Sequence, residues 1–319
     1  MKNNILITGV AGNIGSSLAL ALIKKNYNVI GVDNFLTGSK EKLPSKSYKN
    51  FKFLYANVNN KSKISSIFKS YKIEFVFHFA AVVGVKRTQK FPLKVMDDIN
   101  GIKFLLELSM KYNVRHFYYS SSSEIYGEPV SLPLHEENSP FNSKIPYSVV
   151  KNVSENFIKI YQEEFNLNYT IFRFFNTFGP NQSEDFVIPK FVKLALNNLP
   201  IPIYGDGLQT RTFIYIDDNI DTILNCFEKK LYINDVLNIG SNKEYRIIDL
   251  AKKIINLTNS SSELKYLPAL LRGDMRRRKP VNNKMKKALG RNPFNLTLAL
   301  KKYINFLNEK NSDNWRPPR

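Results

Sequence analysis

The chain has 319 residues, 43% of them hydrophobic, and a formal net charge of +20 at pH 7. This length and apolar content suffice for one large domain carrying a smaller one. No apolar run reaches the roughly 18 residues that span a bilayer, and the apolar stretch NNILITGVAG near the N-terminus is short and broken by glycine. We therefore expect a cytoplasmic protein without a membrane span or a signal peptide.

The positive charge comes mainly from lysines spread along the whole chain. A nucleic-acid partner would require basic residues clustered on one face or interleaved with aromatic residues. The densest basic run is short and consists of Arg276, Arg277, Arg278 and Lys279. We expect no nucleic-acid partner, because an anionic small substrate accounts for a few such charges equally well.

Short apolar runs alternate with amphipathic segments through the first half of the chain. The strand-like runs cover residues 4–10, 27–34, 51–57, 75–81, 116–122 and 169–176. The longest helices are expected over 97–111 and 147–165, each apolar on one face. Strand and helix in alternation predict an α/β fold with a doubly wound parallel sheet, the Rossmann architecture.

Beyond residue 176 the alternation breaks into loops, followed by a strand and helix over 213–228, a strand near 235–241 and a helical C-terminal part. We predict a nucleotide-binding Rossmann domain formed by 1–176 and 213–240. A smaller α/β substrate-binding domain is expected from 177–212 and 241–310, and 311–319 form a tail.

A glycine-rich turn joins the first strand to the first helix. Gly9, Gly12 and Gly15 let the backbone turn tightly and approach a pyrophosphate, which the amides at the helix start can bind. Asp33 ends the second strand, where its carboxylate can accept the ribose hydroxyls of NAD and repel the 2′-phosphate of NADP. Asn57 follows the third strand and either contacts the adenine or is a plain loop residue. This spacing predicts NAD as cofactor.

Tyr147 and Lys151 lie one helical turn apart and therefore on one face. The same spacing occurs at Tyr48 and Lys52, so the spacing alone decides nothing. Tyr147, however, opens a long helix just after a serine-rich strand end, and ligands of such sheets bind outside the carboxyl ends of the strands. Position therefore favours a functional role for this pair.

Seven segments together resemble a known family: TGVAGNIG, VDN, HFAA, SSSEIYG, PYSVVK, RFFNTFGP and GDGLQTRTFIYIDD. In order and spacing they are similar to the extended short-chain dehydrogenase/reductases that act on nucleotide sugars, from about residue 3 to 295. Members of that family include 4-epimerases, 4,6-dehydratases and UDP-glucuronate decarboxylases. The resemblance implies a nucleotide-sugar substrate, oxidation of the sugar C4 hydroxyl by NAD, and a homodimer that pairs the helices at 97–111 and 147–165.

The resemblance extends the expected cofactor site to residues next to the glycine turn and to the ends of later strands. The expected NAD contacts are Gly9, Gly12, Asn13, Ile14, Gly15, Asp33, Asn34, Asn57, Val58, Phe79, Ala80, Ala81, Tyr147 and Lys151. No metal ligand is expected.

The resemblance makes Tyr147 the base that takes the proton from O4. Ionising a phenol near neutral pH takes about 4 kcal/mol of differential stabilisation, which the Lys151 ammonium and the positive nicotinamide are expected to supply. Ser122 stands where the family keeps a serine or threonine that hydrogen-bonds O4. Ser120 and Ser121 are expected to be structural hydroxyls at a strand end.

Two further segments resemble the family's diphosphate-binding parts. Asn176 can donate to phosphate oxygens, and Arg211 offers two parallel donors, with an ion pair to Asp206 as the structural alternative. In LLRGDMRRRKP an arginine directly precedes the glycine, one position later than in the family. Arg272 is therefore an expected substrate contact that any arginine of 276–278 could replace.

The residues after Ser122 favour one reaction among those of the family. Dehydratases place an aspartate before the glutamate, whereas this chain has Ser123, an expected substrate contact, before Glu124. A serine is a poor general acid, so 4,6-dehydration is disfavoured. Glu124 is either a catalytic base near sugar C5 or a solvated loop carboxylate. We predict a nucleotide-sugar 4-epimerase, with a nucleotide-uronate decarboxylase or a 4-dehydrogenase/4,6-dehydratase as alternatives.

A NAD-binding sensor or scaffold is the alternative outside enzymology, because a fold does not fix a function. Such a protein would have no need for a tyrosine, a lysine and a serine at these positions together with a diphosphate arginine. Turnover of any nucleotide sugar would exclude it.

Overall fold

The computed structural model describes residues 3–269 and 276–311 and divides the chain into two compact units. The first unit contains residues 3–127, 141–174 and 220–238, and the second contains 128–140, 175–219 and the described residues from 239 on. The sequence-based boundaries placed 128–140, 175–176, 213–219 and 239–240 in the first domain, whereas the structure groups these segments with the second unit. In the first of them, Leu134 pairs with Pro280 in a parallel bridge.

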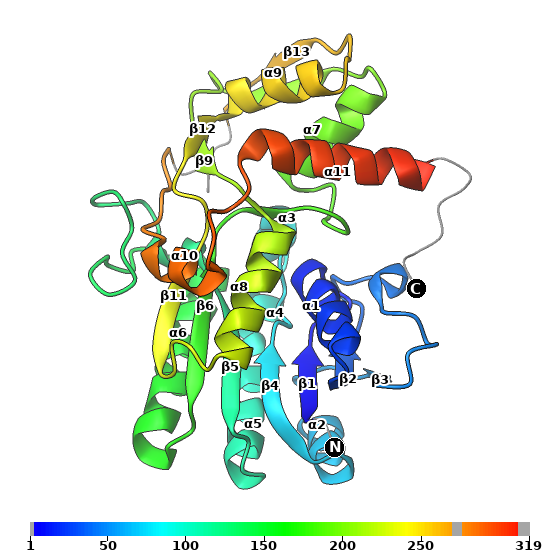
Figure 1. Ribbon diagram of the computed structural model, residues 1–319. Coiled ribbons are helices and arrows are strands. Elements are labelled where there is room, and N and C mark those ends of the chain that lie inside the picture. Colours follow the sequence, from blue (N-terminus) through cyan, green and yellow to red (C-terminus); the bar gives the residue numbers. More distant parts are fainter. Residues whose placement is uncertain (1–2, 270–275, 312–319) are drawn as a thin grey trace. The chain divides into compact units, whose positions relative to one another are not determined.

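A seven-stranded sheet forms the centre of the first unit, with the strand order β11-β6-β5-β4-β1-β2-β3 (Figure 1). From β3 to β6 every pairing is parallel. The strands are β1 (Asn4–Thr8), β2 (Asn28–Asp33), β3 (Phe51–Tyr55), β4 (Ile73–His78), β5 (His116–Ser122), β6 (Tyr169–Phe174) and β11 (Asp235–Ile239). The order reverses between β1 and β4, and ligands of such sheets bind at the carboxyl ends of the strands beside this reversal.

The expected strands are all present, and the predicted α/β doubly wound fold is confirmed. Several are shorter than predicted at their carboxyl ends, because the chain turns before the apolar run is over. β1, for example, ends at Thr8 because Gly9 takes a φ of 73°, which a strand cannot continue. Most residues of β1, β2 and β6 are buried, as expected for parallel strands covered on both faces.

Helices cover both faces of this sheet. On one face lie α2 (Lys61–Ser70), α5 (Asp98–Lys111) and α6 (Pro146–Phe165), and their apolar sides form one buried cluster with the strands. On the other face lie α1 (Asn13–Lys24) and α8 (Ile216–Glu228), whose residues from 220 on belong to this unit (Figure 1). The shorter elements are η1 (Lys40–Lys42), α3 (Val85–Lys90), α4 (Pro92–Met96) and η2 (Ser123–Tyr126).

Local sequence explains both ends of α6. Proline suits the first turn of a helix because its ring fixes φ and its missing N–H has no partner to lose there, and Pro146 stands at that position. Asn166 ends the helix in the left-handed conformation, with a φ of 55°. The helix therefore begins one residue before Tyr147, directly beside the carboxyl end of the sheet.

The second unit is built from three small two-stranded sheets and four complete helices among its described residues. Parallel pairs are formed by β7 (Thr177–Phe178) with β10 (Ile214–Tyr215) and by β8 (Ile201–Tyr204) with β13 (Leu264–Leu267). β9 (Thr210–Thr212) pairs antiparallel with β12 (Glu244–Arg246). The helices are α7 (Val187–Leu196), α9 (Ile247–Leu257), α10 (Asn283–Leu289) and α11 (Leu296–Asn311).

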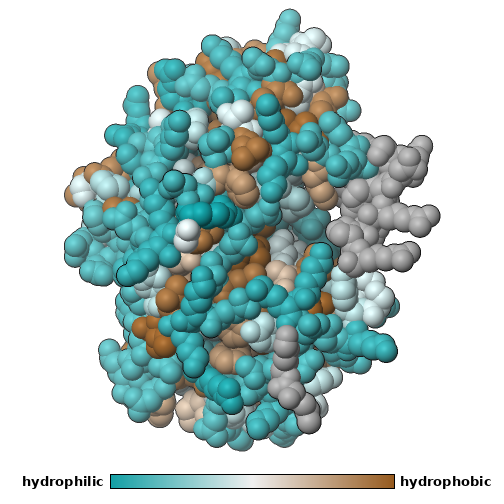
Figure 2. Space-filling view, in the orientation of Figure 1, coloured by the Kyte–Doolittle hydropathy of each residue, from teal (hydrophilic) through white to brown (hydrophobic). Residues whose placement is uncertain are grey.

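Hydrophilic side chains cover most of the face shown in Figure 2, with small apolar patches between them. Within 3–269 and 276–311, none of the helices combines the length and the apolar character needed to cross a bilayer.

Candidate active site

At the glycine turn after β1, the backbone packs closely against neighbouring backbone. Gly9 has a φ of 73°, and a Cβ placed on it would come within 2.6 Å of the backbone nitrogen of Ala80. A Cβ on Gly15 would collide with the carbonyl oxygen of Gly9. At the start of α1 the side-chain oxygen of Asn13 is buried and has no hydrogen-bond donor among the described residues. The backbone amides at the start of α1 could donate to a phosphate group bound at this turn.

The carboxylate of Asp33 faces the same turn. One oxygen accepts a hydrogen bond from the Ala11 amide at 2.9 Å and the other from the Phe35 amide at 2.7 Å. Asp33 is only 8% exposed, and each carboxylate oxygen retains a lone pair for a further donor. The glycine turn and this carboxylate together fit the pyrophosphate and ribose of a dinucleotide.

The remaining expected cofactor residues follow the ends of neighbouring strands. Asn34 and Asn57 each accept a backbone hydrogen bond two residues further on, as in tight polar turns. The side chain of Val58 belongs to the hydrophobic core, so any cofactor contact there must come from its backbone. After β4, the amides of Phe79 and Ala80 donate to the backbone and side-chain oxygens of Thr8. Ile14 and Ala81 are half-buried beside these turns.

Ser122, Tyr147 and Lys151 are brought together at the carboxyl end of β5. The hydroxyl of Ser122 is close enough to the phenol of Tyr147 to lower its pKa, and it accepts the amide of Glu124 at 3.1 Å. Lys151 is 2% exposed, and its ammonium donates to the carbonyl oxygen of Ser120. Its Nζ lies 5.7 Å from the centre of the Tyr147 ring. The expected catalytic trio is therefore adjacent.

The charges around Tyr147 differ from the sequence-based expectation. Burial, and then the carboxylates of Glu124 and Asp98, raise the pKa of Tyr147, while the hydrogen bond from Ser122 lowers it. Burial also lowers the pKa of Lys151 to about 8, although Asp98 and Glu155 oppose this shift. The protein's own residues thus leave Tyr147 a weak acid, and a phenolate near neutral pH requires further positive charge.

Asp98 is a site residue that the sequence did not reveal. One oxygen of its carboxylate accepts the amide of Val82 at 2.8 Å, and its charge acts on both Lys151 and Tyr147. It stands in the first turn of α5, where an acidic residue is ordinary and therefore gives no functional signal. His78 is also buried beside Lys151, hydrogen-bonded to Thr8, with its pKa lowered by burial to about 3, so it stays neutral.

Ser123 and Glu124 lie in the 3₁₀ turn η2 that follows Ser122. Ser123 is buried, whereas Glu124 is half-buried and acts electrostatically on Tyr147. The role of Glu124 as a catalytic base is still a prediction. The Ser123 hydroxyl is the group found where a dehydratase would carry an acid.

The second unit contains the expected phosphate-binding residues. Asn176 donates to the carbonyl of Thr212 at 3.1 Å, and Arg211 lies in β9 opposite Tyr245. Arg272 lies outside the described residues. Of the proposed substitutes, Arg277 forks onto Glu244 at 3.0 and 2.6 Å, while the side chain of Arg278 is 4% exposed. Residues 276–278 lie next to β9, because the amide of Thr210 donates to the carbonyl of residue 276.

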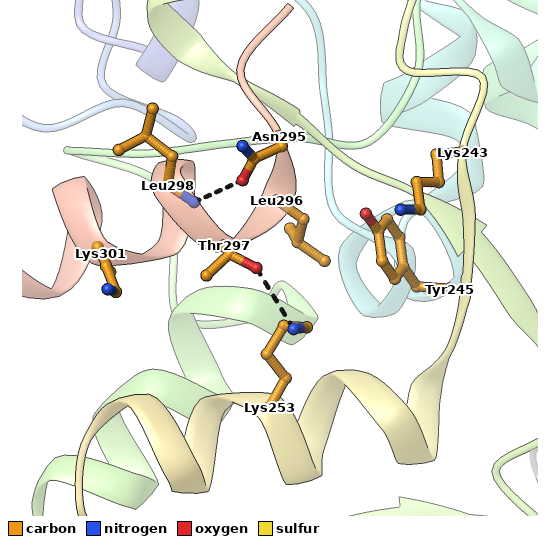
Figure 3. A pocket seen from close by; sticks show the side chains of 8 residues that line it. All are labelled: Lys243, Tyr245, Lys253, Asn295, Leu296, Thr297, Leu298 and Lys301. Carbon is orange, nitrogen blue, oxygen red and sulfur yellow. Dashed lines mark hydrogen bonds between the residues drawn. The ribbon is translucent and has the colours of Figure 1, made fainter.

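A separate open pocket of about 550 Å³ lies in the second unit, at the start of α11 (Figure 3). Lys243, Lys253 and Lys301 line it, and Lys253 donates to the hydroxyl of Thr297 at 3.3 Å. It contains none of the expected site residues. No group of three or more His, Cys, Asp or Glu side chains able to hold a metal ion occurs in the described part of the chain.

Comparison with known proteins identifies the family. Residues 5–240 match the profile of the family described as NAD dependent epimerase/dehydratase. The chain belongs to this family. The resemblance found in the sequence is thereby confirmed, and the cofactor of the protein is NAD.

Individual relatives divide among three reactions. A dTDP-D-glucose 4,6-dehydratase of Dictyostelium discoideum is 36% identical over 269 residues, which are 80% of this chain and 62% of that protein. A UDP-N-acetyl-alpha-D-glucosaminuronate decarboxylase of Bacillus cytotoxicus is 32% identical over 84% of each chain. The crystal structure of a UDP-glucose 4-epimerase from Thermotoga maritima with UDP-glucose superposes with a TM-score of 0.90, at 32% identity over 96% of this chain and 99% of that one.

Proposed function

We propose that this protein is a NAD-dependent nucleotide-sugar 4-epimerase that works through a 4-keto intermediate. The contact of Ser122 with Tyr147 beside the buried Lys151 carries this proposal. The buried residue after Ser122 is a serine and not an acid, which disfavours loss of water from the sugar. Ser122, Tyr147 and Lys151 thus suit removal of the proton from O4 together with the hydride from C4.

The first unit is proposed to hold NAD. The turn at Gly9, Gly12 and Gly15 would bind the pyrophosphate, and Asp33 would accept the ribose hydroxyls. Bound NAD in its oxidised form would supply the hydride acceptor for C4 and a positively charged ring. A positive charge near Tyr147 would lower its raised pKa and favour the phenolate.

The chain's own residues then move the proton. Tyr147 as phenolate takes the proton from O4 while the C4–H bond breaks, and Ser122 donates a hydrogen bond to the same oxygen. Lys151 keeps an ammonium beside the phenolate. Return of the hydride to the opposite face of C4, and of the proton from Tyr147 to O4, gives the epimer. The two half-reactions cancel, so no further oxidant or reductant is needed.

The second unit is proposed to bind the diphosphate of the substrate. Arg211 and Asn176 would bind phosphate oxygens, and Arg278 is a further candidate because it is buried beside β9. The relative from Thermotoga maritima was solved with UDP-glucose, which supports a sugar nucleotide as substrate class. Assignment of the two units to cofactor and substrate is part of this proposal.

A nucleotide-uronate decarboxylase is the second candidate. It is favoured by the electrostatic effect of Glu124 on Tyr147, since a sugar bound at Tyr147 would then lie near this carboxylate. The 32% identity to a decarboxylase supports it as well. In an epimerase no proton leaves C5, so Glu124 would be dispensable.

Three variants separate these possibilities, with NADH absorbance and rapid-quench product analysis on a panel of nucleotide sugars. We expect Ser122→Ala to slow hydride transfer by about 10- to 1,000-fold and Tyr147→Phe to slow it more. Glu124→Gln should keep most of its epimer formation. If the 4-keto sugar accumulates in Glu124→Gln instead, the decarboxylase reading replaces ours. If the wild type turns over no nucleotide sugar, the sensor or scaffold reading takes its place.

A further inference from the structure

A buried network of polar side chains lies in the first unit, partly in the elements that carry Ser122 and Lys151. The guanidinium of Arg173 donates from Nε and Nη2 to the two carboxylate oxygens of Glu155, at 3.0 and 2.7 Å. Its Nη1 donates to the hydroxyl of Tyr126 at 2.8 Å, and that hydroxyl donates to the side-chain oxygen of Asn238 at 2.7 Å. Ser121 donates to Glu155 at 2.5 Å. All five residues are at most 2% exposed.

The network joins every element that carries an expected catalytic group. Ser121 precedes Ser122 in β5, and its register partner in β6 is Arg173. Tyr126 ends the turn η2 that holds Glu124. Glu155 lies one helical turn after Lys151 on α6, so both side chains point to the same side of that helix. One guanidinium therefore connects the strand end, the turn and the helix.

Stability alone is a weak reason for such an arrangement. Burying an ion pair costs desolvation, and apolar residues of similar volume often serve the stability of a core equally well. A forked guanidinium does what an apolar core cannot, because it fixes the direction and the separation of its partners. Burial also raises the pKa of Tyr126 to about 12, so its hydroxyl keeps the proton that it donates to Asn238.

We propose that Arg173, Glu155 and Tyr126 are positioning residues, which hold Ser122 and Lys151 at the distances that proton transfer with Tyr147 requires. This inference rests on the proposed function for its catalytic consequence. Its structural content, a local fixing of residues 120–127 against α6, does not depend on the substrate.

The test uses two mild variants and a matched control. Ser121→Ala and Tyr126→Phe each remove one hydroxyl from the network. Thr170→Val removes an equally buried hydroxyl from β6, one that bonds His116 at 2.8 Å and lies outside the network. We expect the first two variants to lower kcat by about 10- to 100-fold, because small misplacements of reacting groups cost that much. KM should stay within about twofold, since substrate binding is unchanged.

A purely structural role predicts something different. It would lower the melting temperature of all three variants alike and leave kcat unchanged well below that temperature, and this result would overturn the proposal. The double variant Glu155→Met, Arg173→Met removes both charges without leaving one unpaired, so we expect it to fold and to show the same loss of kcat. Wild-type kcat in this variant would also overturn the proposal.

Amide hydrogen exchange gives a second readout that needs no substrate. Ser121→Ala and Tyr126→Phe should exchange faster than wild type over residues 120–127, and Thr170→Val should not. Unchanged exchange in this segment would count against the network whatever the activity. If the wild type turns over no nucleotide sugar, the proposed function fails, while the exchange experiment still decides the positioning role.

Discussion

At the scale of single residues, opposing effects set the pKa of Lys151. Burial lowers the pKa of its ammonium to about 8, and Asp98 and then Glu155 act in the opposite direction. The charge of Glu155 is already matched by the fork from Arg173. Other groups packed around Lys151 are the Tyr119 ring, 4.7 Å from its Nζ, and the neutral His78. Asp98 is therefore the main group that keeps Lys151 protonated.

We predict that Asp98→Asn moves the alkaline limb of the rate profile to lower pH. Lys151 loses its proton as pH rises through its pKa, and activity falls with it because Tyr147 then lacks a neighbouring cation. Removing the Asp98 charge lowers that pKa further, because Asp98 opposes the effect of burial. The measurement is kcat/KM against pH. Asp97→Asn is the control, because Asp97 is exposed and is not among the groups that shift the pKa of Lys151.

Arg211 provides a second prediction at the residue scale. Arg211→Lys replaces a fork by a point charge, and we expect KM for the sugar nucleotide to rise about tenfold, the loss of about one charge-assisted hydrogen bond. NAD affinity should not change. Arg277→Lys is the control, since Arg277 is occupied by Glu244. A lower NAD affinity in Arg211→Lys would show that its place in the site is misassigned.

At the scale of elements, the turn between β1 and α1 requires both a positive φ at Gly9 and a close approach of Gly9 to the backbone of Ala80. The two requirements can be tested separately. Gly9 and Gly290 have nearly the same φ, 73° and 72°, so alanine meets the same backbone strain at both, about 1–2 kcal/mol. A Cβ on Gly9 would strike the backbone of Ala80 at 2.6 Å, whereas nothing lies within 4 Å of one on Gly290. Any difference between the two substitutions reports the close approach alone.

We therefore predict that Gly9→Ala lowers the free energy of unfolding by about 1–3 kcal/mol more than Gly290→Ala does. Gly9→Ala should also weaken NAD binding, and Gly290→Ala should not. Urea unfolding and calorimetric titration with NAD measure the two effects. Equal losses of stability would mean that β1 and β4 move apart easily at this turn.

The elements of the first unit could be predicted because their sequence signals are local. Buried strands read as apolar runs, and Ser122, Tyr147 and Lys151 stand at fixed distances from such runs. The network around Arg173 could not be predicted, because it depends on the register of β5 with β6, which no local pattern specifies. Asp98 was missed for a similar reason, since only packing of α5 against α6 brings it to Lys151.

The second unit was harder to predict. Its strands have two to four residues, too few to show a period, and each pairs with a segment distant in the chain. β8 meets β13 and β9 meets β12 across loops and helices. Arg277 is an example. In the sequence it is part of a run of basic residues, but in the structure its charge is paired with that of Glu244.

At the scale of the whole molecule, the homodimer expected from the family resemblance is still a prediction. Exposed apolar side chains on the two long helices are consistent with it: Met110 on α5 is 40% exposed, and Ile160 and Phe165 on α6 are 44% and 46% exposed. Covering apolar surface of this kind with a second copy removes it from water and lowers the free energy. Against this attraction stands the net charge of +20 on each chain, which repels a second copy.

Because apolar attraction and charge repulsion oppose each other, we predict that the stability of the dimer depends on salt concentration. Light scattering at micromolar concentration should show twice the chain mass of 36.9 kDa, and the dimer should weaken at low ionic strength, where the Debye length grows to about 30 Å and repulsion is less screened. Ile160→Glu should give monomers, because it buries a charge in the contact. Leu298→Glu, at a position 45% exposed on α11, should not. A wild-type monomer at high salt would contradict the pairing of these helices, since screening then leaves the apolar attraction unopposed.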